Sequence, residues 1–121
     1  MWKSAKRLTT VAGVAMLISG SLLALPQVVL AGAVEDGKAV AEDRKKGNCF
    51  GCHDYKGAVM AGNIGPKLEN IKARFPDKAI LRARIADETK FNPNTIMPPF
   101  GKHKILSDQE IDNIVEFIYS L

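Results

Sequence analysis

The most informative part of this 121-residue chain is Cys49-Phe50-Gly51-Cys52-His53. The spacing C-x-x-C-H is typical of covalent haem attachment. Two thiols separated by two residues can bond to the two vinyl groups on one edge of a porphyrin, and the histidine that follows is then placed beneath the iron. We therefore expect one covalently bound haem c, held by Cys49 and Cys52, with His53 as an axial ligand of the iron.

Three other kinds of site compete for these residues. A Cys2His2 zinc site needs two histidines a few residues apart, whereas His53 adjoins Cys52 and His103 lies far along the chain. A thioredoxin-like redox pair belongs in a βαβ context, and no strand-like run follows the motif. A structural disulfide would leave His53 without a role. Haem attachment is the interpretation that uses all the residues of the motif.

The first 33 residues have the composition of a secretory signal peptide. They open with three basic residues, and no further charge appears before Glu35. The stretch between is apolar and rich in small residues, with a break at Pro26. An A-x-A pattern predicts cleavage after Ala31 or Ala33. We expect export to a bacterial periplasm without stable membrane insertion, and an uncleaved membrane anchor is the alternative.

Residues 34–121 are expected to form one domain of 88 residues. The leader holds three of the 17 basic residues and none of the 13 acidic ones, so the domain has 14 basic against 13 acidic residues. A charge near +1 gives no reason to expect nucleic-acid binding. A chain of this length builds only a modest core, and a haem provides an apolar plate around which helices can pack. We expect the haem-free domain to be poorly folded.

The remaining sequence predicts an all-α domain. Asp77 is a plausible N-cap, and Ser107 with Glu110 forms a capping box before a run of apolar residues at helical spacing. Pro76 stops one helix, and Gly47 is a helix-ending signal for another. The expected helices cover residues 35–47, 68–75, 78–88 and 108–120.

Three residues of the predicted domain are candidates for the second axial ligand of the iron. Met60 follows His53 closely and is therefore expected on the same side of the haem. Met97 lies in a stiff loop whose following residue, Pro98, keeps it out of a helix. His103 stands between two lysines and is expected to be an exposed surface histidine. We predict that Met97 ligates the iron, with His103 or an open site as alternatives.

The run Asn63-Ile64-Gly65-Pro66-Lys67-Leu68 is similar to a segment of class I c-type cytochromes. The resemblance implies that the carbonyl of Pro66 accepts the Nδ1 hydrogen of His53 and so orients the ring, with Leu68 on the haem face. A plain turn at Gly65-Pro66 is the alternative. The implied fold is a small class I cytochrome c fold, with three to five helices around the haem and the two terminal helices crossing.

Three blocks in order resemble the SoxX family, the monohaem subunit of the SoxAX sulfur-oxidation complex. They are Asp43-Arg44-Lys45-Lys46-Gly47-Asn48-Cys49, Gly62-Asn63-Ile64-Gly65-Pro66, and the run from Asn92 to Gly101 with Thr95 and Met97-Pro98-Pro99-Phe100. The resemblance covers nearly all of residues 37–121.

This resemblance implies a periplasmic heterodimer with a SoxA-like haem subunit. The complex would join thiosulfate to a cysteine of a SoxYZ-like carrier, and this chain would pass electrons to a downstream cytochrome. The chain is not expected to be catalytic alone, because two axial ligands leave no substrate position on the iron. No cysteine remains for sulfur chemistry once Cys49 and Cys52 bind haem.

Two other functions stay open at this point. The chain could be a free-standing cytochrome c shuttle with no link to sulfur oxidation, or a gas or redox sensor in which Met97 is labile. A basic run over residues 72–84 is either a docking patch for an electron-transfer partner or a solvated helix face.

Overall fold

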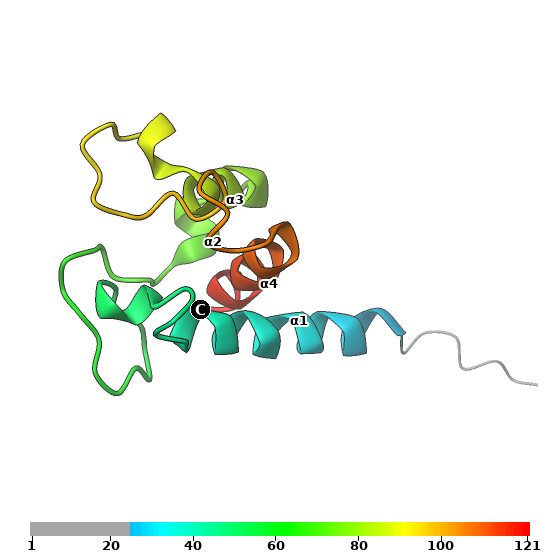
Figure 1. Cartoon of the computed structure of the whole chain (residues 1–121). Coiled ribbons are helices and arrows are strands. Elements are labelled where there is room, and N and C mark those ends of the chain that lie inside the picture. Colours follow the sequence, from blue (N-terminus) through cyan, green and yellow to red (C-terminus); the bar gives the residue numbers. More distant parts are fainter. Residues whose placement is uncertain (1–24) are drawn as a thin grey trace, which may run out of the picture.

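The computed structural model describes residues 25–121, with side chains from Ala31 onward, and this part of the chain is helical without any strand (Figure 1). The prediction of an all-α domain is confirmed. The elements are α1 (Leu25–Glu42), η1 (Cys49–Gly51), α2 (Ile71–Arg74), α3 (Lys78–Ala86), η2 (Glu88–Lys90) and α4 (Asp108–Tyr119), where η marks a 3-10 turn.

Helix α1 is displaced toward the N-terminus from the predicted range of 35–47. Pro26 falls in its first turn, where a proline removes no helical hydrogen bond, so this residue does not interrupt the helix. After Glu42 the chain folds back, and Gly47 N donates to Val40 O over 3.2 Å. A Cβ at Gly47 would lie 2.7 Å from that same oxygen, so the tight return requires glycine.

The basic start of the predicted leader, and its apolar stretch up to residue 24, lie outside the described residues. The predicted cleavage positions, Ala31 and Ala33, lie within α1. Within residues 25–121, no helix is long and apolar enough to cross a membrane.

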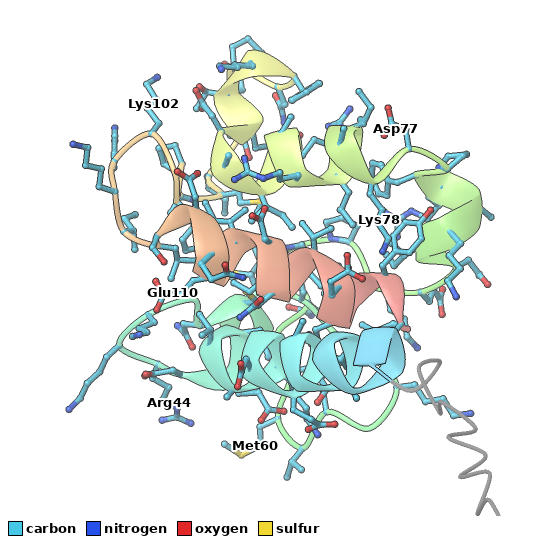
Figure 2. The ribbon with its side chains drawn as sticks, turned by 90° about the vertical axis from the view of Figure 1, so that its right-hand side faces the viewer. Arg44, Met60, Asp77, Lys78, Lys102 and Glu110 are labelled. Atoms are coloured by element: carbon cyan, nitrogen blue, oxygen red, sulfur yellow. The ribbon has the colours of Figure 1, made fainter. Side chains whose placement is uncertain are left out.

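The two terminal helices cross each other at close range, as expected (Figures 1 and 2). A Cβ on Gly37 of α1 would lie 1.9 Å from the backbone oxygen of Asn113 on α4. Only a residue without a side chain permits this approach of the two backbones. The crossing point is therefore fixed by Gly37.

The sequence signals for α3 and α4 agree with the structure. Asp77 accepts from Ala79 N over 2.8 Å at the start of α3. Ser107 and Glu110 form both halves of the capping box at the start of α4. The inner face of α4 is buried as its spacing predicts, through Ile111, Ile114, Val115, Phe117 and Ile118.

The helix predicted over residues 68–75 is shorter in the structure. Asn70 has a left-handed backbone with φ of 53°, which prevents helical geometry from starting before Ile71. The single turn α2 ends before Pro76, as predicted. Helix α3 likewise ends at Ala86, because Asp87 leaves helical geometry and caps η2 instead.

An aromatic cluster links the haem motif to the core. The rings of Phe50 and Tyr55 lie 4.3 Å apart between centroids, and both meet the edge of Phe117 on α4. Tyr55 also donates to Glu42 at the end of α1 over 2.9 Å. This packing holds η1 and its cysteines against the two crossed helices.

Candidate haem-binding site

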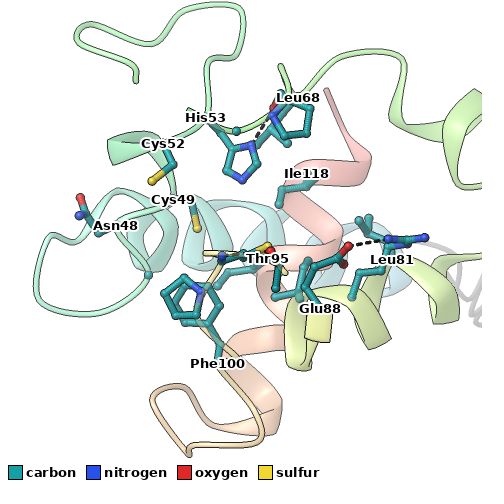
Figure 3. Close-up of a pocket in the computed structure, with 18 of the residues that line it drawn as sticks. Asn48, Cys49, Cys52, His53, Leu68, Leu81, Glu88, Thr95, Phe100 and Ile118 are labelled. Carbon is teal, nitrogen blue, oxygen red and sulfur yellow. Dashed lines mark hydrogen bonds and ion pairs between the residues drawn. The ribbon is translucent and has the colours of Figure 1, made fainter. Parts of the chain in front are cut away.

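A cavity of about 750 Å³ opens between the haem motif and the loop that precedes α4 (Figure 3). Its volume falls within the roughly 300–1,000 Å³ usual for small-molecule and cofactor sites. The predicted site residues all line this cavity: Cys49, Cys52, His53, Pro66 and Met97. The structure thus brings together side chains that are up to 48 positions apart in the sequence.

The two cysteines are presented by the single turn η1. Asn48 precedes it with a left-handed φ of 45°, and the turn is closed by Cys52 N and His53 N, which donate to Cys49 O over 3.2 and 2.9 Å. Both thiols are free, and Figure 3 shows them on one side of the cavity. Burial raises the pKa of Cys49 to about 11, so this thiol is protonated at neutral pH.

The ring of His53 is oriented by a single hydrogen bond. Its Nδ1 donates to the carbonyl oxygen of Pro66 over 2.7 Å. A carbonyl oxygen can only accept, so the proton sits on Nδ1 and Nε2 keeps its lone pair. This arrangement makes an imidazole a good metal ligand with a fixed ring plane.

Gly65 lies directly against the His53 ring. A Cβ at this position would be 2.5 Å from Cε1 of the ring, closer than any side chain could tolerate. The backbone N–H of Gly65 donates to Cys52 O over 2.8 Å, which fixes the position of the glycine. The glycine before Pro66 is therefore needed for the ring to occupy its place, a role that the sequence analysis did not assign.

Met97 lines the cavity from the loop between η2 and α4, and Figure 3 shows Thr95 and Phe100 of this loop across the cavity from His53. The backbone N–H of Met97 donates to Oγ1 of Thr95 over 3.1 Å. Further along, Gly101 N donates to Ala86 O at the end of α3 over 2.9 Å, and Phe100 is buried. The loop is thereby held to α3 just beyond Met97.

The two rejected ligand candidates do not line the cavity. Met60 is 79% exposed, and Figure 2 shows it pointing outward beyond α1. His103 is exposed, at the turn between Gly101 and α4. Among residues 25–121, no group of three or more histidine, cysteine or acidic side chains could hold a metal ion.

These residues fit a covalently bound haem. Two thiols lie at one side of the cavity, an imidazole held through Nδ1 lies on one wall, and a thioether is carried by the loop that forms another wall. Much of the rest of the lining is apolar, through residues that include Leu68, Ile71, Leu81, Ile85, Phe100, Ile114 and Ile118, and charged and polar side chains complete it. This donor set matches an iron porphyrin with histidine and methionine as axial ligands.

The basic run over residues 72–84 is largely paired within the molecule. Lys78 binds Glu116 over 2.7 Å, and Arg82 binds Asp108 and Asp112 on α4. These pairs join α3 to α4, which favours a structural role over a free docking patch.

Two members of the basic run, Arg74 and Arg84, line the cavity, as does Glu88, and none of the three was predicted to do so. The available signal was helical spacing, since Arg84 follows the buried Leu81 by three positions and therefore lies near the same face.

Comparisons with known proteins agree with this site. A family model for cytochrome c matches residues 34–121. An uncharacterized lipoprotein of Aquifex aeolicus (strain VF5) is 36% identical over 76 residues, which are 62% of this chain and 37% of that protein. The chain thus spans little more than a third of this curated relative.

A solved structure is also similar. In the crystal structure of SoxXA from P. pantotrophus, one chain matches with a TM-score of 0.63 and 25% sequence identity. The match covers 70% of this chain and 78% of that chain.

Proposed function

Because this chain belongs to the cytochrome c family and is a SoxX-like protein with one covalently bound haem c, we propose that it is the monohaem electron-transfer subunit of a SoxXA-type complex. We assign the thioether bonds to Cys49 and Cys52, and the iron ligands are His53 and Met97. Pro66 orients His53. The observation that carries this assignment is a single cavity lined by all five residues.

When bound, the haem supplies a one-electron iron couple. The chain sets the properties of that couple. His53 is held by Pro66 with Nε2 free to bind iron, and the Met97 thioether favours the ferrous state compared with harder ligands. The apolar lining disfavours extra charge on the iron and keeps water away. If His53 and Met97 both bind the iron, the chain alone would relay electrons and would have no place for a substrate on the metal.

Exposed apolar residues near the cavity support a permanent partner. Ile64 and Ile96 are 64% and 76% exposed, and both line the cavity. A group of large apolar side chains in water is unfavourable unless a partner covers it. We infer that a SoxA-like haem subunit covers this side of the molecule.

The SoxX resemblance then defines the wider reaction. The partner haem would be the place where thiosulfate is joined to a cysteine of a SoxYZ-like carrier, and electrons would leave through this chain to a downstream cytochrome. The sequence holds only two cysteines, both assigned to haem, which is consistent with a relay.

We place the protein in the periplasm, with residues 1–33 removed as a signal peptide. The leader composition and the lipoprotein described among its relatives support an extracytoplasmic location. Intact mass of the purified holoprotein tests the cleavage: the expected mass is that of a chain starting after Ala31 or Ala33 plus one haem. Retention of the leader would contradict it and favour the membrane anchor.

The partner is tested by affinity purification of the tagged chain from thiosulfate-grown cells of the native host. We expect a larger haem-bearing subunit to co-purify in equal amount, detected by haem staining and identified by mass spectrometry. An Ile64→Glu substitution should release this subunit, whereas Ile80→Glu, at a 44% exposed position on α3, should not. Recovery of the wild-type chain alone would refute the complex and indicate a free-standing shuttle.

A further inference from the structure

Asp87 lies at the junction where the loop that carries Met97 leaves α3 and returns to it. This loop covers residues 88–101, and at its far end the backbone N–H groups of Gly101 and Lys102 donate to the last carbonyl oxygen of α3 over 2.9 and 3.2 Å. Among the residues with described side chains, Asp87 is the only charged one that is buried, at 5% exposed. Charged side chains are rarely buried without partners, so the partners of this carboxylate are informative.

The two carboxylate oxygens of Asp87 bind opposite ends of this loop. At the first end, Oδ1 accepts a hydrogen bond from the backbone N–H of Thr89 over 3.2 Å and another from the Thr89 hydroxyl. At the other end, Oδ2 lies 3.7 Å from Nζ of Lys102, which is the distance of an ion pair rather than of a hydrogen bond. One buried carboxylate therefore joins the start of the loop to its end.

The middle of the loop, which carries Met97, is not tied to the rest of the domain in this way. In the described part of the chain, the hydrogen bonds made by residues 92–98 stay within the loop, as in the bond of Met97 N to Oγ1 of Thr95. The neighbouring Ile96 is 76% exposed. The place of the Met97 thioether thus depends on where the two ends of the loop are fixed.

We propose that Asp87 is a positioning residue for Met97, whose carboxylate binds both ends of the loop and so holds the thioether where it can ligate the iron. This inference rests on the assignment of Met97 as an iron ligand under the proposed function. No described hydrogen bond joins Asp87 to Met97, so the carboxylate acts through the loop. Such positioning matters because a metal–ligand distance must be correct to within about 0.2 Å.

The surroundings of Asp87 keep its carboxylate ionised. The hydrogen bond from the Thr89 hydroxyl lowers the pKa of Asp87 most, the positive charges of Lys102 and Lys90 lower it further, and burial opposes them. The neighbouring charges of α3 and η2, Arg84 and Glu88, bind each other. A carboxyl group with a lowered pKa keeps its contacts at neutral pH and loses them as the pH falls through that pKa. The hold on the loop should therefore weaken only on the acid side.

The test follows methionine–iron bonding in the purified holoprotein, through the far-red absorption band of the ferric form and the rate at which carbon monoxide binds the ferrous form. Carbon monoxide can bind only when the methionine leaves the iron. Asp87→Ala removes the acceptor of Thr89 and the partner of Lys102, so we expect a weaker band and carbon monoxide binding that is about tenfold faster.

Asp77→Ala is the matched control, because Asp77 caps the other end of α3 through Ala79 N, and Figure 2 shows it well away from Lys102. It removes a comparable cap and should lower the melting temperature, but it should leave the band and the carbon monoxide rate unchanged. Equal changes in the two variants would mean that Asp87 only stabilises the fold, and would overturn the proposal.

Two milder variants decide the question if Asp87→Ala yields no holoprotein. Asp87→Asn keeps an acceptor for Thr89 but loses the charge, and Lys102→Gln removes the other half of the ion pair at a position whose side chain is 54% exposed. Each should speed carbon monoxide binding about two- to fivefold, and Lys102→Arg should restore the wild-type rate. The difference between Asp87→Asn and the wild type should shrink as the pH falls, because the wild-type carboxylate is then protonated as well.

The double variant of Asp87→Asn and Lys102→Gln should bind carbon monoxide no faster than the faster single variant, since both changes break one ion pair. Unchanged bands and rates in the Asp87 and Lys102 variants would overturn the proposal while leaving Met97 as the ligand. Haem content and the far-red band of the wild type are measured first. A wild-type holoprotein without that band would refute the ligand assignment and this inference with it.

Discussion

The two walls of the haem cavity are built in different ways. The wall that carries His53 is fixed by backbone bonds close in sequence, with Gly62 N to Phe50 O and Gly65 N to Cys52 O both at 2.8 Å. The wall that carries Met97 is a loop held at its ends by hydrogen bonds. At the first end Thr89 N donates to Asp87, and at the other end Gly101 N and Lys102 N donate to Ala86 O. The histidine side is therefore bonded directly to the haem motif, and we expect it to be the stiffer of the two walls.

Substituting Met97 should have the largest effect. Met97→Ala removes the thioether but none of the bonds that hold the opposite wall, so we expect the haem to remain attached and ligated by His53. The weak far-red absorption band that marks methionine–iron bonding in the ferric protein should disappear completely, and carbon monoxide should bind the ferrous protein rapidly.

Met60→Ala serves as the control, because Met60 is 79% exposed and does not line the cavity. It should keep the band and the slow carbon monoxide reaction of the wild type. Loss of the band in Met60→Ala, or its survival in Met97→Ala, would show that the second ligand has been assigned wrongly.

A matched pair of glycine substitutions compares the rigidity of the two walls. In Gly65→Ala the new Cβ would lie 2.5 Å from the His53 ring, whereas in Gly101→Ala it would lie 3.1 Å from the Cβ of Ala86. Forced overpacking costs about 1–3 kcal/mol, so we expect Gly65→Ala to destabilise the holoprotein by that amount and to perturb the haem spectrum. Gly101→Ala should change the unfolding free energy by less than about 1 kcal/mol.

Denaturant unfolding, followed through the haem absorption, measures both variants. Equal losses of stability in the two would contradict the view that the histidine wall is the stiffer one.

The smallest effect concerns the ion pair that links the two walls. Lys46 lies just before the haem motif and binds Glu110, just after the methionine loop. The hydrogen bond from Lys46 lowers the pKa of Glu110 from 4.5 to about 2. A carboxyl group with a lowered pKa stabilises the fold above its unfolded pKa, and that contribution is lost as the pH falls from about 4.5 towards 2.

Melting temperatures from pH 7 to pH 2 test this link. Glu110→Gln should melt a few degrees lower than wild type at pH 7, and the difference should vanish at the acid end. The control is Glu116→Gln, which removes the ion pair between Lys78 and Glu116, a residue on the same helix as Glu110. This variant should still show the fall in melting temperature at acid pH that is due to Glu110. A pH-independent gap between Glu110→Gln and the wild type would contradict the assignment.

Local signals in the sequence predicted the elements that local bonds define. The caps at Asp77 and Ser107 are present as expected, and the Pro66 carbonyl meets His53 as the class I resemblance implied. Met97 lies in the cavity, although its iron bond stays a prediction. Helix boundaries near Gly47 and Asn70 were misplaced because backbone contacts and left-handed geometry, rather than composition, set them.

Contacts between distant segments could not be predicted from the sequence. Helical spacing was able to indicate only that Arg84 lies near the buried side of α3, because its place in the cavity lining depends on walls contributed by other segments. Likewise, nothing near Gly65 in the sequence shows that the ring of His53 rests on it. Such roles depend on the assembled cavity.

The crossing of α1 and α4 at Gly37 also bears on the order in which the contacts of the domain form. The backbone that Gly37 touches belongs to Asn113, 76 positions later in the sequence. A contact over such a separation forms late, because the intervening chain must first be brought together. The packing of α1 on the haem motif, through Glu42 and Tyr55, involves a far shorter separation than its crossing with α4. The crossing of α1 with α4 is therefore expected to be among the last contacts of the domain to form.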